Sequence, residues 1–385
     1  MFSELARLET VLAATYRDRV QYELLQNSDD AGATSVNVQI RSDGLVSWSN
    51  NGRPFDRADA EGLCRSASST KIRGESIGYR GIGFKALAAV ASRVKVESAR
   101  TSFTFDREEA ARLLAAAGDS VDRRSVPLTR IPTQVARSDV NVGASFTITP
   151  NNQVEDRQIL GAINPLSLLF LRNLRELNIE TPNTSVTFAL ERNADRLVLS
   201  VDRRTAEFAV LQDAKATIAV PLNDMALSLT TIRGRLACFL PVDDALGVPL
   251  VISGDFLTDP SRTHAVLGDP STQTVLENAA GAFAAVLSNP QHHWFERAWT
   301  LMIQAEDPRS ILASGGGSTD FVFLSRLRDH LAIASLPFTI SPIPLQREEL
   351  RHLFPNGADA GDFCAARDSS DSCINRTYPP YGNPS

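Results

Sequence analysis

The chain has 385 residues, which is more than a domain with a single hydrophobic core usually contains, so two or three domains are expected. Hydrophobic residues make up 43% and charged residues 22%, as is typical of a soluble globular protein. The formal net charge of −6 argues against a general nucleic-acid binder, although a local basic groove stays compatible with it.

The cysteines and the apolar runs exclude further classes. Cys64, Cys238, Cys364 and Cys373 are scattered without a C-x-x-C pair, which argues against a zinc site and favours a reduced, cytoplasmic setting. The start, "MFSELARLE", lacks the apolar core of a signal peptide. No run approaches the roughly 20 apolar residues of a membrane helix, so no membrane contact is expected.

In chain order, residues 3–31 show the apolar spacing of a helix, and Gly32 is a typical stop. "SVNVQI" and "LVSWSN" follow, and "RSDG" between them predicts a hairpin. Residues 51–83 are rich in Gly, Ser and charge, which indicates a long functional loop. "FKALAAVASRV" is helical in pattern. The remaining strand-like runs are "VKVES", "TSFTFD", "ASFTITP", "ELNIE", "SVTFAL", "LVLSVD", "EFAVL", "RLACFLPV" and "PLVISGDF", followed by helical patterns near 272–289, 292–304 and 319–334.

Three stretches carry polar or glycine residues at distinctive spacing. In "YELLQNSDDAGA", Glu23, Asn27 and Asp30 share one helix face. In "WSNNGRPF", Asn50 offers a side-chain carbonyl and Gly52 allows close approach of a flat group. Alone, the first stretch is typical of a solvated helix face and the second of an Asn-Gly turn.

The third stretch, "GESIGYRGIGFKALA", crowds three glycines just ahead of a helix. Such glycines let the backbone approach a ligand, while free N–H groups and the helix dipole favour an anion. Their spacing is G-x-x-G-x-G, which matches neither a P-loop nor a Rossmann fingerprint. Taken alone, the cluster is explained better by a structural turn than by an anion site.

Together and in this order, the three stretches resemble the GHKL ATPase superfamily, which includes gyrase, the ninety-kilodalton heat-shock chaperones, histidine kinases and MutL. The closest resemblance is to the sacsin-type branch. It implies an α+β fold class: a two-layer GHKL (Bergerat) α/β sandwich, then a transducer-like α/β domain and a helical region. The expected domains are residues 1–165, with a lid at about 57–80, then 166–290, 291–355, and a disordered tail at 356–385.

The resemblance implies roles for the matching residues. Glu23 takes the place of the general base, Asn27 that of the Mg²⁺ ligand, and Asp30 closes the motif at the pocket wall. ATP and Mg²⁺ are the implied cofactors. Asn50 stands where most members have an aspartate that reads adenine, and Gly52 lies under the base. Ala144 replaces the usual threonine after Gly143, so Ser145 is the candidate substitute. The remaining implied nucleotide contacts are Lys71 in the lid, with Ser69 beside it, and Gly78, Tyr79, Arg80, Gly81, Ile82, Gly83, Phe84 and Lys85 around the phosphates.

The second half carries one catalytic candidate. "GDFLTDPSR" resembles the middle-domain segment of the chaperones, in which an arginine reaches the γ-phosphate, and this resemblance assigns that role to Arg262. Alone, the segment is equally explained by two buried strands, a turn and a surface cation. Arg233 and Arg235 are secondary candidates.

Several functions remain open. A histidine kinase is excluded because its phosphoacceptor histidine lies upstream of the nucleotide domain, whereas the first histidine here is His264. The resemblance implies an ATP-dependent homodimeric clamp that binds ATP and ADP, with a protein client or partner subunit as for a chaperone. The alternatives are a nucleic-acid client, as in MutL or prokaryotic defence systems, and a non-hydrolysing nucleotide-binding scaffold.

Overall fold

The structure is a computed structural model and describes residues 2–16, 19–64, 83–118, 122, 125–152, 163–305, 308–314 and 316–334. Its strands are β1 Ser35–Ile40, β2 Val46–Asn50, β3 Ala91–Ser98, β4 Thr101–Asp106, β5 Pro132–Arg137, β6 Ala144–Pro150, β7 Glu176–Glu180, β8 Ser185–Arg192, β9 Arg196–Val201, β10 Arg204–Gln212, β11 Ala216–Pro221, β12 Arg235–Cys238, β13 Leu240–Pro241 and β14 Val251–Gly254. Its helices are α1 Phe2–Tyr16, α2 Val20–Asp30, α3 Arg57–Cys64, α4 Leu87–Val90, α5 Arg107–Ala116, α7 Asp224–Thr230, α8 Pro270–Ser288, α9 Phe295–Gln304, α10 Pro308–Ala313 and α11 Thr319–Ile333, with 3₁₀ turns η2 Gly83–Ala86 and η4 Pro165–Leu168.

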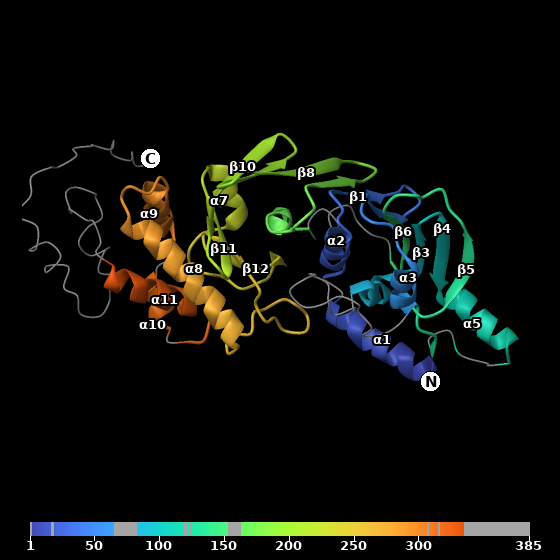
Figure 1. Ribbon diagram of the computed structural model, residues 1–385. Coiled ribbons are helices and arrows are strands. Elements are labelled where there is room, and N and C mark those ends of the chain that lie inside the picture. Colours follow the sequence, from blue (N-terminus) through green and yellow to red (C-terminus); the bar gives the residue numbers. More distant parts are fainter. Residues whose placement is uncertain are drawn as a thin grey trace, which may run out of the picture.

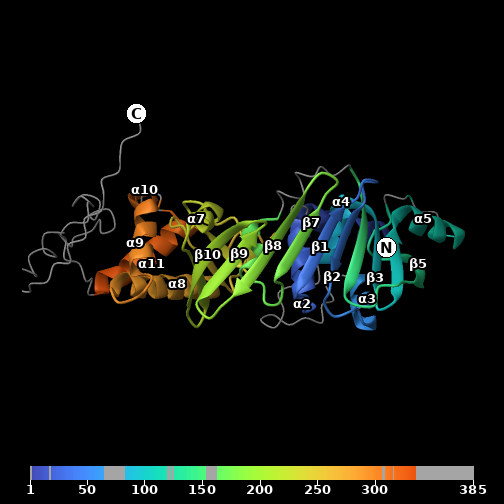
Figure 2. The same ribbon diagram turned by 90° about the horizontal axis from the view of Figure 1, so that it is seen from above.

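The described strands form one sheet that runs along the molecule, in the order β13-β12-β14-β11-β10-β9-β8-β7-β1-β2-β6-β3-β4-β5. Figure 2 shows the strands side by side, with the carboxyl-terminal helices gathered at one end. The two halves of the chain meet where β1 pairs in parallel with β7, with Val36 opposite Leu177 and Val38 opposite Ile179. Both strands therefore lie in the interior of the sheet, and their buried side chains belong to the same hydrophobic cluster.

The hydrophobic core forms two clusters. The first packs α2, η2, α4 and residues 163–174 against the sheet from β4 to β11, and it also includes Ala237, Leu240 and Val251 of β12 to β14. The second packs α8, α9 and α11 against the strands from β10 to β14. On β11, Ala219 belongs to the first cluster, whereas Ile218 and Val220 belong to the second. Because successive strand residues point to opposite faces, the second half of the sheet is covered on both sides.

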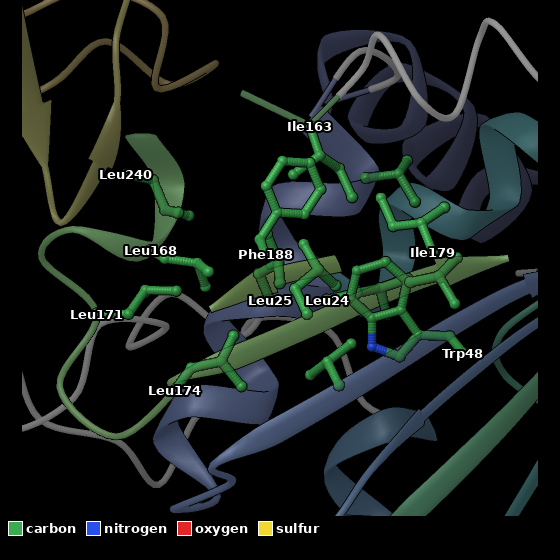
Figure 3. Packing of buried hydrophobic residues seen from close by; sticks show 14 of the residues in the cluster. Leu24, Leu25, Trp48, Ile163, Leu168, Leu171, Leu174, Ile179, Phe188 and Leu240 are labelled. Atoms are coloured by element: carbon green, nitrogen blue, oxygen red, sulfur yellow. The ribbon is translucent and has the colours of Figure 1, made fainter. Parts of the chain in front are cut away.

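Figure 1 shows α1 and α2 on one face of the first half of the sheet. Leu24 and Leu25 of α2 point into the first cluster beside Trp48, Leu174 and Phe188 (Figure 3). The predicted inward packing of the two leucines is therefore confirmed. The polar residues of α2 lie around this apolar anchor.

Asp29 fixes α2 to the segment that leads into β7. Its carboxylate is completely buried and accepts hydrogen bonds from the backbone N–H groups of Arg172 (3.1 Å), Asn173 (2.7 Å) and Leu174 (2.9 Å). The Asn173 side chain also donates to the Asp29 carbonyl at 2.9 Å. Charge-assisted bonds of this kind are stronger than neutral ones, so Asp29 joins the end of α2 to the second half of the chain.

The predicted elements agree with the structure in part. The hairpin is confirmed, because β1 and β2 pair antiparallel, and Gly32 ends α2 with φ +73°. The single helix predicted over residues 3–31 is wrong, because two helices, α1 and α2, occupy this stretch. The helical pattern after residue 84 ends at Val90, where β3 takes over.

The mixed architecture, a large sheet with several helices, is compatible with the predicted α+β class. The predicted domain boundary falls in residues 163–174, whose apolar side chains are deeply buried in the first cluster. The domain division itself stays a prediction, and residues 356–385 lie outside the described residues. Among the described helices, none combines the length and apolar character needed to span a bilayer.

Replacing Asp29 tests how far the fold depends on its buried carboxylate. We expect Asp29→Ala to lower the free energy of unfolding by about 3 kcal/mol or more, because three backbone N–H groups lose a buried, charged acceptor. Urea unfolding measures the change. The control Asp43→Ala, at an exposed ion pair with Arg41 in the hairpin turn, should cost less than about 1 kcal/mol. Equal losses in the two variants would contradict the anchoring role.

Candidate functional site

The predicted catalytic residues from the two halves of the chain lie in contact. A guanidinium nitrogen of Arg262 lies 3.3 Å from Oε1 of Glu23, and the same side chain donates a hydrogen bond to Oε1 of Gln26. Glu23 is 5% exposed and Gln26 is 3% exposed. A buried carboxylate needs a compensating partner, and here the second half of the chain supplies it.

Asn27 and Asp30 lie on the same helix and are half-buried, and both take part in further interactions. The described residues contain no cluster of three or more His, Cys, Asp or Glu side chains that would hold a metal ion. Mg²⁺ prefers oxygen ligands and commonly keeps water and phosphate oxygens, so one or two protein oxygens are sufficient. Asn27 carries an amide oxygen, a ligand type that Mg²⁺ accepts, and its role as the Mg²⁺ ligand stays a prediction.

Arg19 was missed by the sequence reasoning. It immediately precedes α2, is 8% exposed, and donates from Nη1 to the carbonyl of Pro241 in β13 at 3.0 Å. Its guanidinium also lies 4.5 Å from the ring centroid of Tyr22. Burial lowers the pKa of Arg19, against the opposing effect of nearby Tyr22, Asp243 and Glu23. An arginine between two helices gives no sequence signal for such a contact, because its partner is a distant carbonyl.

Two glycines let three backbone segments converge at the predicted adenine end. A Cβ on Gly52 would lie 2.8 Å from the carbonyl oxygen of Ala31. Gly143 has φ +69°, and a Cβ there would lie 1.8 Å from the carbonyl oxygen of Asn50. Substitution of either glycine therefore forces these segments apart.

The side chain of Asn50 is partly occupied within the turn. Its Oδ1 accepts from the N–H of Gly52 at 3.0 Å, and its position in β2 is opposite Ala144 in β6. Neighbouring Asn51 holds the turn, because its Oδ1 accepts from the N–H groups of Thr34 and Ser35, both at 2.9 Å. The asparagine pair thus stabilises the end of the hairpin while Asn50 keeps a second oxygen lone pair and an amide group.

Ser145 does not join Asn50. Ala144 is opposite Asn50 and is buried with the core, so Ser145, the next residue in the same strand, points to the other face of the sheet. We therefore do not retain Ser145 in the proposed site. The hydroxyl of buried Ser98, opposite Ala144 in β3, donates to the Gly143 carbonyl and accepts from the N–H of Phe55 at 3.0 Å.

The glycine-rich segment is described only at its end. Gly83 begins η2, and Phe84 packs in the core with ring centroids 5.6 Å from Phe105 and 6.1 Å from Phe146. The other predicted contacts in this region lie outside the described residues: Ser69, Lys71, Gly78, Tyr79, Arg80, Gly81 and Ile82.

Lys85 points into the protein in this arrangement. Its ammonium donates to the carbonyls of Leu63 and Thr129, the latter at 2.9 Å, and the residue is 3% exposed. Burial, with a smaller effect from Arg130, lowers the pKa of Lys85 to about 8. Lys85 thus ties α3 to residues 125–130, and a phosphate contact would require it to leave these carbonyls.

The secondary arginine candidates lie elsewhere. Arg233 forms an ion pair with Asp320 of α11, which is 4% exposed. Arg235 in β12 has a buried Nε without a hydrogen-bond partner. Of the three predicted arginines, Arg262 is the one whose ion pair is with Glu23.

No protein-family model matches the chain. The chain is similar to proteins described as DNA mismatch repair protein MutL. Over 157 residues it is 29% identical to the protein from Streptococcus sanguinis, which covers 38% of this chain and 23% of the relative. It is 25% identical over 230 residues to the protein from Trichlorobacter lovleyi, and 28% identical over 245 residues to that from Gemmatimonas aurantiaca.

The matches to these last two relatives cover 57% and 59% of this chain. The chain spans only about a quarter to a third of the relatives' length, 23% to 33%. MutL is a member of the GHKL superfamily, so this modest similarity supports the superfamily resemblance. It does not show closeness to the sacsin-type branch, which stays a prediction.

The lowered pKa of Lys85 predicts a stability that depends on pH. An unfolded lysine keeps its proton up to about pH 10.5, whereas folded Lys85 releases it near pH 8. Between these two pH values the unfolded chain holds more protons than the folded protein. The free energy of unfolding of the native protein, minus that of Lys85→Met, should therefore rise with pH, by about 3 kcal/mol at most. Urea unfolding across this range measures the difference. Lys95→Met, which removes an exposed ion pair, is the control. A difference between native protein and Lys85→Met that does not change with pH would contradict the lowered pKa of Lys85.

Proposed function

We propose that the chain binds Mg-ATP on α2 and hydrolyses it in the manner of a GHKL ATPase. The observation that carries the proposal is the contact of Arg262 with Glu23 and Gln26. It brings an arginine from the second half of the chain to the predicted base. The convergence of Gly52, Asn50 and Gly143 at the end of β2 gives further support, as does the similarity to MutL proteins.

Each residue has a defined part in the proposed reaction. Glu23 accepts the proton of the water that attacks the γ-phosphate. Arg262 stabilises the negative charge that develops on the transferred group. Bound Mg²⁺ would supply charge neutralisation at the phosphates, and Asn27 would hold it. Asn50 and Gly52 form the adenine end of the proposed site, and Asp30 lies at the end of α2.

The Glu23–Arg262 ion pair has a consequence for this reaction. A carboxylate paired with a guanidinium is a poorer base, because the positive charge favours its ionised form. A bound γ-phosphate competes for Arg262 and thereby releases Glu23. Nucleotide binding would then both recruit the arginine and activate the base, which is consistent with ATP-driven closure of a clamp formed by two copies of the chain.

The client of such a clamp is a second question. The similarity to proteins described as DNA mismatch repair proteins favours a nucleic-acid client. A protein client, as for a chaperone, remains the alternative implied by the sacsin-type and chaperone resemblances. A pull-down on immobilised DNA with and without ATP separates them, since only the first predicts ATP-dependent retention that falls with rising salt.

Substitution of Glu23 tests catalysis directly. We expect native protein to bind ATP with Mg²⁺ and to release phosphate, and Glu23→Ala to bind ATP but turn over about 10²-fold or more slowly, because the base is lost. Asn27→Ala should weaken the effect of Mg²⁺ on binding. Isothermal titration and a phosphate-release assay give the two quantities.

The exposed Glu191→Gln serves as the control and should retain native turnover. Native protein that binds ATP without hydrolysing it would support the scaffold alternative instead. Turnover at the native rate in Glu23→Ala would show that another group is the base.

Arg262→Ala should slow turnover on the order of 10²-fold with little change in ATP affinity, because the arginine acts mainly on transition-state charge. Arg262→Lys should recover only part of the rate, since an ammonium lacks the planar fork of a guanidinium. The exposed Arg204→Ala is the matched control. Loss of binding with unchanged turnover of the bound nucleotide would give Arg262 a binding role instead.

A further inference from the structure

Arg262 is carried by residues 258–265, here called the arginine loop, which is organised around one carboxylate. Oδ1 of Asp259 accepts from the N–H groups of Thr263 at 2.8 Å and His264 at 3.1 Å. Its Oδ2 accepts from the hydroxyls of Ser261 and Thr263, the latter at 2.8 Å. A single side chain thus satisfies four donors inside a loop of eight residues.

Backbone bonds close the same loop. The N–H of Asp259 donates to the carbonyl of His264 at 2.9 Å, and the N–H of Arg262 donates to the carbonyl of Asp259 at 3.0 Å. Thr258 and Ala265 form an isolated antiparallel bridge at the base of the loop. Burial acts to raise the pKa of Asp259, but hydrogen bonds from Ser261, His264 and Thr263 outweigh it and lower that pKa. The carboxylate therefore stays ionised near neutral pH.

Arg262 itself has a left-handed backbone, with φ +58°. Only glycine adopts this region without a steric penalty, so surrounding bonds must hold an arginine there. The conformation directs the side chain toward α2, where it meets Glu23 and Gln26. A relaxed loop would lose this direction, because nothing in the arginine's own preferences selects it.

A second carboxylate ties the loop to the carboxyl-terminal helices. Oδ2 of Asp244 accepts from the N–H of Ala265 at 2.7 Å, and its Oδ1 accepts from the hydroxyl of Thr319 at 2.9 Å. Thr319 is the first residue of α11. His264 also approaches Asp244, with Nδ1 at 3.6 Å from Oδ1. The base of the arginine loop is therefore joined to the start of α11.

We propose that Asp259 is a positioning residue for Arg262, and that Asp244 secures the arginine loop against the first turn of α11. This inference rests on the proposed function and deepens it, because it names the groups that set the arginine's position. Asp259 does not touch the reacting atoms. It acts by fixing the loop conformation that sends Arg262 to Glu23.

Kinetics separates positioning from general destabilisation. Asp259→Ala should lower kcat at least tenfold and leave KM for ATP within about twofold. In an Arg262→Ala background the same change should alter kcat by less than about twofold, because residues that act through one another are not additive. Asp259→Asn keeps an Oδ1 for the two N–H groups and should recover part of the rate.

The matched control is Asp269→Ala. Asp269 likewise accepts from backbone N–H groups, of Ser271 and Thr272, and from the Ser271 hydroxyl, but it caps α8. It should leave kcat within about twofold. The proposal would be overturned if Asp259→Ala lowered kcat by the same factor in the native and Arg262→Ala backgrounds. It would also be overturned if Asp269→Ala lowered kcat as much as Asp259→Ala does.

A second measurement does not depend on ATP. A double-mutant cycle of Glu23→Ala and Arg262→Ala, read by urea unfolding, should show a coupling on the order of tenfold in the unfolding equilibrium constant. In an Asp259→Ala background the coupling should vanish. A coupling that persists in the Asp259→Ala background would overturn the positioning role, even if the protein hydrolyses ATP. If the coupling is lost in that background but the native protein does not hydrolyse ATP, only the proposed function is refuted.

Two further variants complete the test. If Asp259→Ala fails to fold, Asp259→Asn replaces it in both measurements and should reduce kcat and the coupling to intermediate values; unchanged values would overturn the proposal. Thr319→Val keeps the shape of the side chain but removes the donor to Asp244, and should lower kcat two- to fivefold only when Arg262 is present. An equal effect without Arg262 would overturn the link to α11.

Discussion

The parallel pairing of β1 with β7 is the constraint on which the rest of the structure depends. It joins two halves of the chain, each with its own helices, into one sheet. The buried carboxylate of Asp29 holds the segment before β7 against the end of α2. With α2 fixed in this way to the second half, Arg19 reaches Pro241 and Arg262 reaches Glu23.

The polar residues of α2 thus serve two different purposes. Asp29 is a structural anchor, and its three N–H partners offset the cost of burying it. Glu23 and Gln26 face the second half of the chain and share one arginine. Because α2 provides both the Asp29 anchor and the Arg262 contact, it carries few apolar residues. Leu24 and Leu25 attach it to the hydrophobic core.

Local patterns were predictable where the cause was local. The hairpin of β1 and β2 follows from strand alternation around "RSDG", and the end of α2 follows from Gly32. The helix α5 was not among the predicted elements. Its N-cap, Asp106, accepts from two backbone N–H groups but is also the last residue of β4, so the helix follows the strand without an intervening loop. Ser145 was proposed as the substitute for the family's threonine, which Ala144 replaces, but strand alternation relative to Asn50 puts Ser145 on the opposite face.

The sequence alone, through its resemblance to the GHKL superfamily, indicated Glu23, Asn27, Asn50 and Arg262 as the candidate site residues. It also determined the β1–β2 hairpin and the helices α8, α9 and α11, whose periodicity is set by neighbouring residues. Only the tertiary structure decided that Arg262 contacts Glu23, that Arg19 and Asp29 join the halves, and that Lys85 points to carbonyls. Those contacts join residues far apart in the chain, and burial and hydrogen-bond geometry, which select them, exist only in the folded protein.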